Sequence, residues 1–181
     1  MKPGIALQSD KELAEAAGVN VAAISYHFGG KEALYHAVLE YQFEPIAQAL
    51  EQVNLLQQLY PEERLEVYAK SIVRIHAQRP FLIRFMHSEL TNPTKCFETV
   101  VTKYVSRVFA FINTVLCDGI AAGSFNPDLN TGFAALSLAG ILNFYFIGRP
   151  LVKEILPMSS MDDGAYIDQA FSIFMEGIRR R

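Results

Sequence analysis

The sequence predicts an all-α fold in two parts: an N-terminal helix-turn-helix domain at 1–42 and a larger helical domain at 43–181. Helix-capping residues, glycines and prolines recur at spacings typical of helix ends. Strand-like alternation of apolar and polar residues is nearly absent. A content of 51% hydrophobic and 19% charged residues indicates a chain that folds around a core.

The first expected helix covers residues 10–17. Ser9 and Glu12 have the spacing of a capping box, in which the serine hydroxyl accepts the amide three residues on and the glutamate bonds back. Gly18 ends this helix, because glycine tolerates the left-handed torsions of a helix C-terminus.

Two further helices follow at once. Asn20 can cap a short helix at 21–27, and Gly29 with its neighbouring glycine breaks it. A long helix then covers about 31–53, and we expect Pro45 to bend it because proline removes one backbone hydrogen bond.

Proline and glycine divide the remaining chain into helices and loops. Pro61 and Pro80 suit first helical turns, Gly123 ends a long helix, and Pro150 should end the apolar helix before it. The expected helices cover residues 61–78, 80–90, 95–122, 131–148 and 164–179, with a short piece at about 150–156.

Two short helices around a glycine turn form a helix-turn-helix, whose second helix enters the major groove of DNA. Small side chains there can approach thymine methyls, and a serine can bond a base or a phosphate. The small residues at exposed positions of this helix are Val21, Ala22, Ala23 and Ser25. Tyr26 and His27 lie near its end, where phosphate contacts are common. Lys31 and the free amides of the next helix could hold one phosphate.

The runs LAEAAGVNVAAISYHF at 13–28 and KEALY at 31–35 closely resemble the DNA-binding signature of the TetR family of transcriptional regulators. The resemblance implies groove-facing roles for the four small residues named above. It implies phosphate-contacting roles for Asn20, Tyr26, His27 and Lys31. Two alternatives stay open: Tyr26 and Phe28 could close the small core, a role we expect for Phe28, and His27 could be a plain cap or surface residue.

Family members begin with a long amphipathic helix that packs across the helix-turn-helix. Here only the short run 3–8 precedes the capping box, so we expect this first helix to be missing from the chain. Leu13, Ala17, Ile24 and Leu34 would then lose a packing partner, and burial of one Leu-sized side chain contributes roughly 1.5–3 kcal/mol. We therefore expect a mobile N-terminal region and weaker DNA binding, which an N-terminally extended chain would restore in a gel shift.

The helices at 131–148 and 164–179 carry broad apolar surfaces that predict a homodimer. A helix that is apolar nearly all round must be covered on both sides, in this case by a second subunit or by an internal core. In the TetR family the last two long helices form a four-helix bundle with the partner. The expected interface residues are Phe133, Leu136, Phe144, Ile147, Ile167, Phe171 and Phe174.

Aromatic residues with a few polar neighbours between residues 61 and 122 are typical of a pocket for a small apolar or amphipathic effector. The alternative to an effector pocket is that these side chains only fill the hydrophobic core. The candidate pocket residues are Tyr68, Ile72, His76, Phe85, Phe109, Asn113 and Leu142. The segment 88–94, SELTNPT, resembles a TetR subgroup with a CecR-like C-terminal domain, which does not define a ligand.

These features predict a ligand-responsive repressor that a small molecule releases from a palindromic operator. The effector would shift the population of states toward a spacing of the two DNA-binding heads that misfits the DNA. A net charge of −3 and a mildly acidic N-terminal region leave an alternative, namely a ligand-binding or interaction module that does not bind DNA.

Other classes of protein find little support. No nucleophile–base pair, phosphate loop or carboxylate pair indicates an enzyme or a cofactor. Cys96 and Cys117 lack metal-ligand spacing, and His76 with His87 would meet at a metal only by accident of folding. We see no signal peptide, and the apolar run 133–147 is shorter than the ~20 residues of a spanning helix, so we expect a cytoplasmic protein with no membrane contact.

Overall fold

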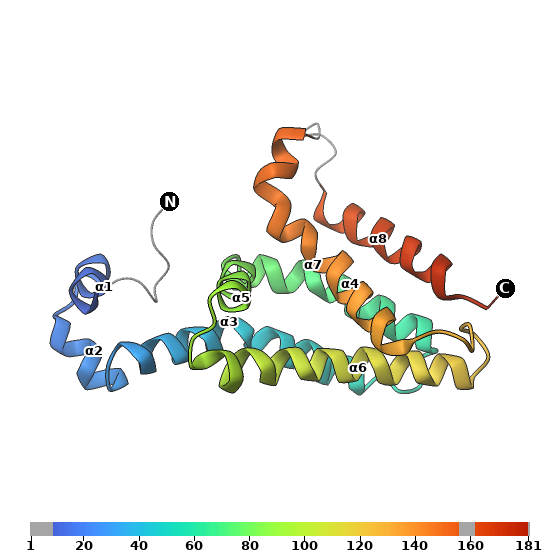
Figure 1. Ribbon diagram of the computed structural model, residues 1–181, viewed down its shortest axis with the longest axis horizontal. Coiled ribbons are helices and arrows are strands. Elements are labelled where there is room, and N and C mark those ends of the chain that lie inside the picture. Colours follow the sequence, from blue (N-terminus) through green and yellow to red (C-terminus); the bar gives the residue numbers. More distant parts are fainter. Residues whose placement is uncertain (1–8, 156–161, 181) are drawn as a thin grey trace.

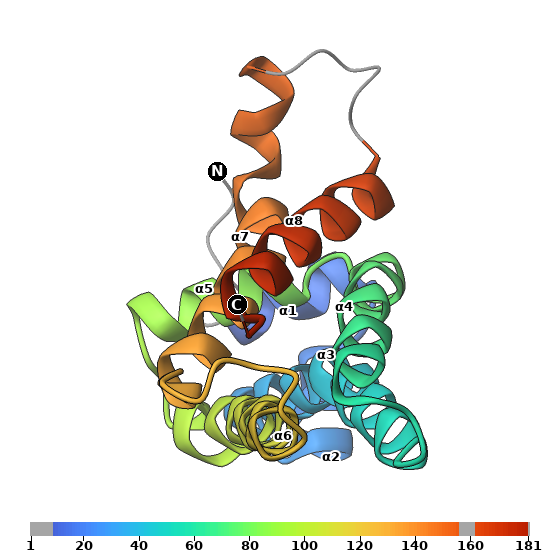
Figure 2. The same cartoon turned by 90° about the vertical axis from the view of Figure 1, so that its right-hand side faces the viewer.

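The computed structural model describes residues 9–155 and 162–180, and this part of the chain is all-α with no β-strand. The helices are α1 (Asp10–Ala17), α2 (Val21–Phe28), α3 (Lys31–Asn54), α4 (Pro61–Gln78), α5 (Leu82–Thr91), the π-helix η2 (Phe97–Val101), α6 (Thr102–Ala121), α7 (Thr131–Ile155) and α8 (Asp163–Ile178). The two short helices α1 and α2 lie at one end of the molecule (Figure 1). Viewed from the opposite end, α7 and α8 rise together above α3, α4 and α6 (Figure 2). The predicted fold class is confirmed.

The helix ends in the N-terminal motif form as their capping residues predict. The Ser9 hydroxyl accepts the Glu12 amide at 3.3 Å, and the Ser9 amide donates to the Glu12 carboxylate at 2.7 Å. Gly18 ends α1 at φ 67°, and the Asn20 side chain accepts the Ala22 amide at 2.9 Å. The expectation of a missing first helix rests on residues 1–8, which lie outside the described residues.

Helix α3 joins the helix-turn-helix to the helical body as one continuous element (Figure 1). It leaves α2 at Gly30 and then packs against α4, α5, η2 and α6. Pro45 lies inside this helix and is buried. The domain boundary that we expect at residue 42 therefore falls within one helix.

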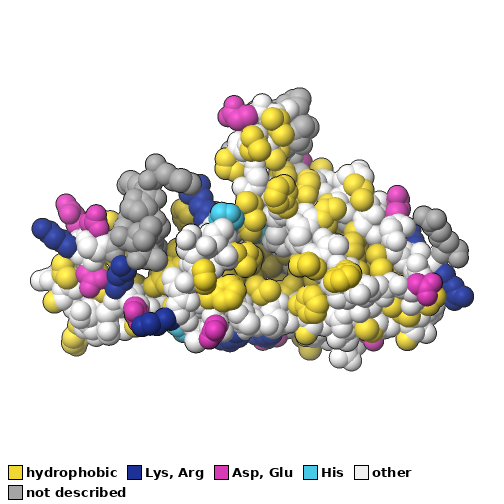
Figure 3. Space-filling model, viewed as in Figure 1, with side chains coloured by type: hydrophobic (Ala, Val, Ile, Leu, Met, Phe, Trp, Pro, Cys, Tyr) yellow, Lys and Arg dark blue, Asp and Glu magenta, His cyan; other side chains and the backbone are white. Residues whose placement is uncertain are grey.

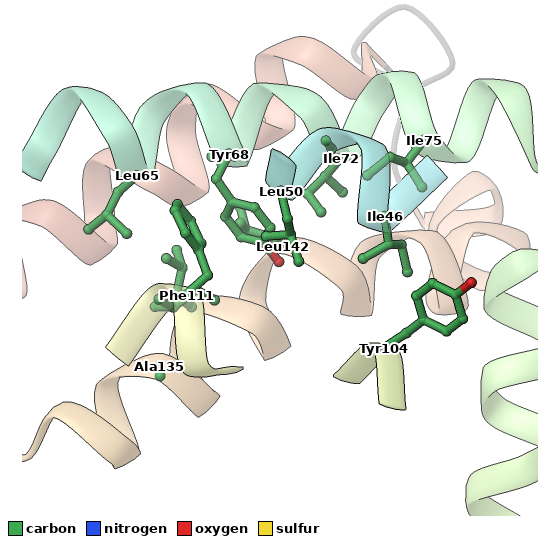
Figure 4. Packing of buried hydrophobic residues seen from close by; sticks show 14 of the residues in the cluster. Ile46, Leu50, Leu65, Tyr68, Ile72, Ile75, Tyr104, Phe111, Ala135 and Leu142 are labelled. Carbon is green, nitrogen blue, oxygen red and sulfur yellow. The ribbon is translucent and has the colours of Figure 1, made fainter. Parts of the chain in front are cut away.

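The hydrophobic core lies between α3, α4, α6 and α7. Leu65, Tyr68 and Ile72 of α4 point toward Phe111 of α6 and Leu142 of α7 (Figure 4). All five side chains are at most 6% exposed. The buried side chains of α3 belong to the same cluster, so this close packing fixes the position of α3 relative to α4, α6 and α7.

Two helix predictions need correction. The segment before α6 is a π-helix rather than a regular α-turn, and the Thr102 hydroxyl donates to the carbonyl of Phe97, five residues earlier, at 3.1 Å. Helix α7 does not stop at Pro150 but continues to Ile155. Proline costs an internal hydrogen bond and usually kinks a helix without having to end it, and the ribbon of α7 bends in its upper part (Figure 1).

The turn between α6 and α7 is anchored by one aromatic ring. Phe125 is fully buried, and its ring lies against Gly119 of α6. A Cβ added at Gly119 would stand 2.2 Å from the Phe125 ring, so the absence of a side chain at 119 is what admits the ring.

Two helical stretches, Phe97–Ala121 and Thr131–Val152, are long and apolar enough to span a membrane by length and composition alone. Both pack against each other and against the rest of the helical body. Core helices of soluble proteins give the same signal, so this observation is weak evidence for a membrane.

Candidate nucleic-acid interface

Helices α1 and α2 cross through a very small core. Ala14 and Ile24 are 1% and 5% exposed and hold the two helices together. Ala17 and Val19, at the end of α1 and in the turn after it, are exposed. With so few buried contacts, the capping bonds and the Gly18 turn contribute much of what holds the motif.

Most of the predicted DNA-contacting residues are exposed, along α2 and beside its ends. Tyr26 is 85% exposed, and the Ala23 and Lys31 side chains are half-buried. Exposed residues of the predicted set are Asn20, Val21, Ala22, Ser25, Tyr26 and His27. Phe28 is 45% exposed, so the expectation that it closes the small core is wrong for the described residues. It lies on the last turn of α2, beyond the crossing with α1.

The start of α3 offers backbone amide donors next to the exposed residues of α2. Gly30 precedes the helix, and among residues 9–155 and 162–180 no side chain caps its first amides. Lys31 is the first residue of the helix, and its charge helps to lower the pKa of the exposed Glu12 carboxyl. The larger causes of that lowered pKa are the amide and the hydroxyl of Ser9. A helix N-terminus beside a lysine favours a phosphate.

The predicted pocket residues are mostly core residues in this structure. Tyr68, Ile72, His76 and Leu142 are buried, Phe85 and Asn113 are half-buried, and Phe109 is 43% exposed. Tyr68 packs on Phe111 with ring centroids 5.7 Å apart. The structure therefore brings Tyr68, Ile72 and Leu142 together between α4 and α7 as packed side chains (Figure 4).

His76 is the buried polar residue of the predicted pocket set. Its ring stacks on Phe146 at a centroid distance of 3.9 Å, and its Nε2 lies 3.1 Å from the Asn143 Oδ1. Burial lowers the pKa of His76 below its usual value, although the bond to Asn143 opposes the shift. His76 is consequently an uncharged side chain at neutral pH.

Two surface hollows lie elsewhere. One, of about 350 Å³, lies between α4 and α8 and includes Lys70 and Phe171 in its lining. The other, of about 400 Å³, lies beside Pro127 and Arg180. Phe171 belongs to the predicted interface set, and no residue of the predicted pocket set lines either hollow.

The expected interface residues fall into two groups. The four on α7 form an exposed stripe: Phe133 is 73%, Leu136 66%, Phe144 70% and Ile147 38% exposed. Leu151 and Ile155, both about two-thirds exposed, extend it. On α8, Ile167 and Phe174 lie in the chain's own core and Phe171 is half-buried, because this face of α8 packs against α4 and α7. Hydrophobic side chains also gather over the middle of the face seen in Figure 3.

One buried polar group was missed at the sequence level. Glu89 of α5 is fully buried and accepts hydrogen bonds from Tyr35 of α3 and from Thr94. It lies in the segment SELTNPT, whose resemblance to a TetR subgroup marked the segment without giving a role. Within residues 9–155 and 162–180, no three His, Cys, Asp or Glu side chains are grouped in a way that could hold a metal.

Comparisons with known proteins agree with this architecture. The family model described as "Bacterial regulatory proteins, tetR family" matches residues 6–38, and "HTH-type transcriptional dual regulator CecR, C-terminal domain" matches residues 61–178. A curated relative, "Probable HTH-type transcriptional regulator YttP" of Bacillus subtilis (strain 168), is 27% identical over 157 residues. That match covers 86% of this chain and 75% of the relative.

Solved structures share the fold. The TetR family transcriptional regulator PfmR from Thermus thermophilus matches with a TM-score of 0.77 and 18% identity, covering 98% of this chain and 92% of that one. The ketosteroid transcriptional regulator KstR2 of Mycobacterium tuberculosis matches with a TM-score of 0.72 and 17% identity, covering 99% and 90%.

A helix-turn-helix at one end of an all-α body, with its second helix exposed, defines a DNA-binding regulator. The chain belongs to the TetR family of transcriptional regulators and has a C-terminal domain of the CecR type. Proteins of this family bind DNA, act as dimers and are soluble cytoplasmic regulators rather than enzymes.

Proposed function

We propose that this chain is a homodimeric, ligand-responsive repressor that binds a palindromic operator and leaves it when a small apolar or amphipathic molecule binds the body. The observation that supports it most is the exposed surface of α2. Val21, Ala22 and Ser25 are exposed to solvent, and the exposed residues Asn20 and Tyr26 flank them in the sequence. Small side chains at the start of a recognition helix allow close approach to base edges.

Phosphate contacts would fix the register of this helix in the groove. In the described part of the chain no side chain caps the first amides of α3, which begins with Lys31, and His27 lies in the last turn of α2. Because the chain has a net charge of −3, binding would depend on these few positions rather than on bulk charge.

Dimerisation would place two such helices on one duplex. The exposed stripe of α7, which includes Phe133 and Phe144, is a large apolar surface of the kind that a second copy covers. Two recognition helices about 34 Å apart match successive major grooves, which is why the operator should be palindromic.

Effector binding would require movement within the body. Tyr68, Ile72 and Leu142 fill the space between α4 and α7, so a molecule entering there must displace packed side chains. Binding of the effector would therefore require α4 and α7 to shift. That shift would favour a different spacing of the two DNA-binding heads in the dimer. Helix α3 runs from the DNA-binding motif into the body and would transmit the shift.

The test is selection of duplexes from a random-sequence library by the full chain, followed by footprinting and a salt titration of the best duplex. We expect a protected palindrome with two half-sites one helical turn apart, and affinity that falls steeply with salt. Failure to enrich any duplex would favour a ligand-binding module without DNA binding. Equal affinity at low and high salt would contradict phosphate contacts at Lys31 and His27.

A further inference from the structure

The first turns of α3, which follow the helix-turn-helix directly, are tied to the body through a buried carboxylate. Glu89 is 0% exposed. Its Oε1 accepts the Tyr35 hydroxyl of α3 at 2.7 Å. Its two oxygens also accept the Thr94 hydroxyl at 3.0 Å, and Oε2 accepts the Thr94 amide at 3.1 Å. We call Tyr35, Glu89 and Thr94 the Glu89 network.

The Glu89 network joins three segments that otherwise meet through apolar packing and one exposed ion pair, between Glu32 and Lys95. Glu89 lies on the last turns of α5, and Thr94 lies in the loop before η2. The Thr94 hydroxyl also accepts the Cys96 amide at 3.1 Å, so the same hydroxyl orders the entry to the π-helix. Figure 1 shows α5 above α3 and the start of the η2–α6 segment below it, and all three are in contact.

Because Glu89 is buried, this connection is rigid, and loss of a single hydrogen-bond donor should weaken it. A buried carboxylate needs all its donors, and loss of one leaves an unsatisfied polar group. The exposed ion pair between Glu32 of α3 and Lys95 is different: both side chains are more than 80% exposed, and solvent screens the attraction. Tyr35 remains a phenol and a donor, because burial, reinforced by Glu89, raises its pKa.

Tyr35 lies one turn beyond Lys31, so any tilt at Tyr35 displaces the whole helix-turn-helix. We propose that Glu89 is a positioning residue for DNA binding, which fixes the angle of α3 relative to the α5–η2 junction through Tyr35 on one side and Thr94 on the other. This inference rests on the proposed function, since it assigns the contact that couples the body to the DNA-binding head.

The experiment compares variants that each remove one hydroxyl. Y35F deletes the bond from α3 to Glu89 while the ring keeps its place beside Phe85. T94V deletes the hydroxyl on the body side, which has no contact with α3 in the network, and T94S restores it. The matched control is Y166F, which loses a 2.7 Å hydroxyl bond to the Ile141 carbonyl between α8 and α7, far from α3.

The first readout is affinity for a duplex selected by the unmodified chain. We expect Y35F and T94V each to bind about tenfold more weakly, while T94S and Y166F stay within about twofold. The double variant Y35F/T94V should bind no worse than the weaker single variant, because both act on the same carboxylate. Binding of Y35F and T94V within about twofold of the unmodified chain, or equal weakening by Y166F, would overturn the proposal.

The second readout needs no DNA and so separates this inference from the proposed function. Amide hydrogen exchange should be faster in α2 and the first turns of α3 for Y35F and T94V, and unchanged there for Y166F. Unchanged exchange in Y35F and T94V would overturn the proposal whether or not the chain selects a duplex. Faster exchange would support it even where DNA binding fails, and circular dichroism confirms that each variant is folded.

Discussion

At the scale of single residues, Lys31 offers the simplest test of how the chain holds DNA. Lys31→Ala should weaken binding of the selected duplex about equally for all sequences. It should also reduce the slope of log affinity against log salt by about 2, because a bound dimer loses one lysine–phosphate contact in each subunit. The measurement is a salt titration of the dissociation constant. Lys70→Ala, which removes an exposed lysine of α4, is the control and should leave the slope unchanged. An identical slope for both variants would show that Lys31 contacts no phosphate.

His76 predicts a dependence of stability on pH. In the unfolded chain this histidine takes up a proton near pH 6.5, whereas burial keeps it neutral to lower pH in the folded chain. The unfolded state therefore binds more protons below about pH 6.5, and the free energy of unfolding falls as the pH falls through this range.

His76→Gln should flatten that dependence. The measurement is urea unfolding at about pH 7.5 and about pH 5.5 at one fixed protein concentration. We expect a smaller loss of stability at the lower pH in His76→Gln than in the unmodified chain. An equal loss in both would mean that other groups account for the acid sensitivity.

The sequence located the exposed residues of α2 but not the buried ones around Glu89. Caps and short-range spacing place Asn20 and Ser25 from neighbouring residues alone. Glu89 finds its partner Tyr35 54 residues away, and such a contact exists only once α3 and α5 are packed. Phe28 was misplaced for the same reason, since an aromatic residue at a helix end gives no local signal of burial.

At the scale of elements, the Gly18 turn should limit the stability of the helix-turn-helix. Gly18→Ala places a Cβ at φ 67°, a region that costs other residues roughly 1–2 kcal/mol, although the added atom meets nothing within 4 Å. We expect faster amide exchange in α1 and α2 with little change in the body.

Gly177→Ala is the matched control for this prediction. Gly177 also has open space around it but lies inside α8 without positive φ, so alanine there should stabilise by about 0.5–1 kcal/mol. Equal destabilisation by both changes would show that backbone torsion is not the cause.

Helix ends marked by a capping side chain or a glycine were predictable, whereas those set by tertiary packing were not. The cap at Ser9 and the glycine at 18 encode where α1 begins and ends, and both form as expected. The π-turn before Thr102 and the continuation of α7 through Pro150 depend on how these segments pack. Tertiary packing can outweigh the local preference of a proline to end a helix, and no local sequence pattern predicts when this happens.

At the scale of the whole molecule, the stripe on α7 predicts the oligomeric state. Phe144→Glu should convert a dimer into a monomer in analytical ultracentrifugation, because an isolated charge cannot be buried against a second copy. Leu55→Glu, at an exposed leucine after α3, should leave the dimer intact. The monomer should bind a half-site weakly and a palindrome hardly better. A dimer that survives Phe144→Glu would move the interface elsewhere.

The pairing of Gly119 with Phe125 has a consequence for how this protein can vary. The Phe125 ring fills the space left by the missing side chain of Gly119. A methyl group at 119 would occupy the volume of the ring, and a smaller residue at 125 would leave a void. The two positions should therefore change together in homologous sequences, with any gain of volume at one matched by a loss at the other. A lone substitution at either position would crowd or loosen the turn between α6 and α7, the helix with the exposed stripe.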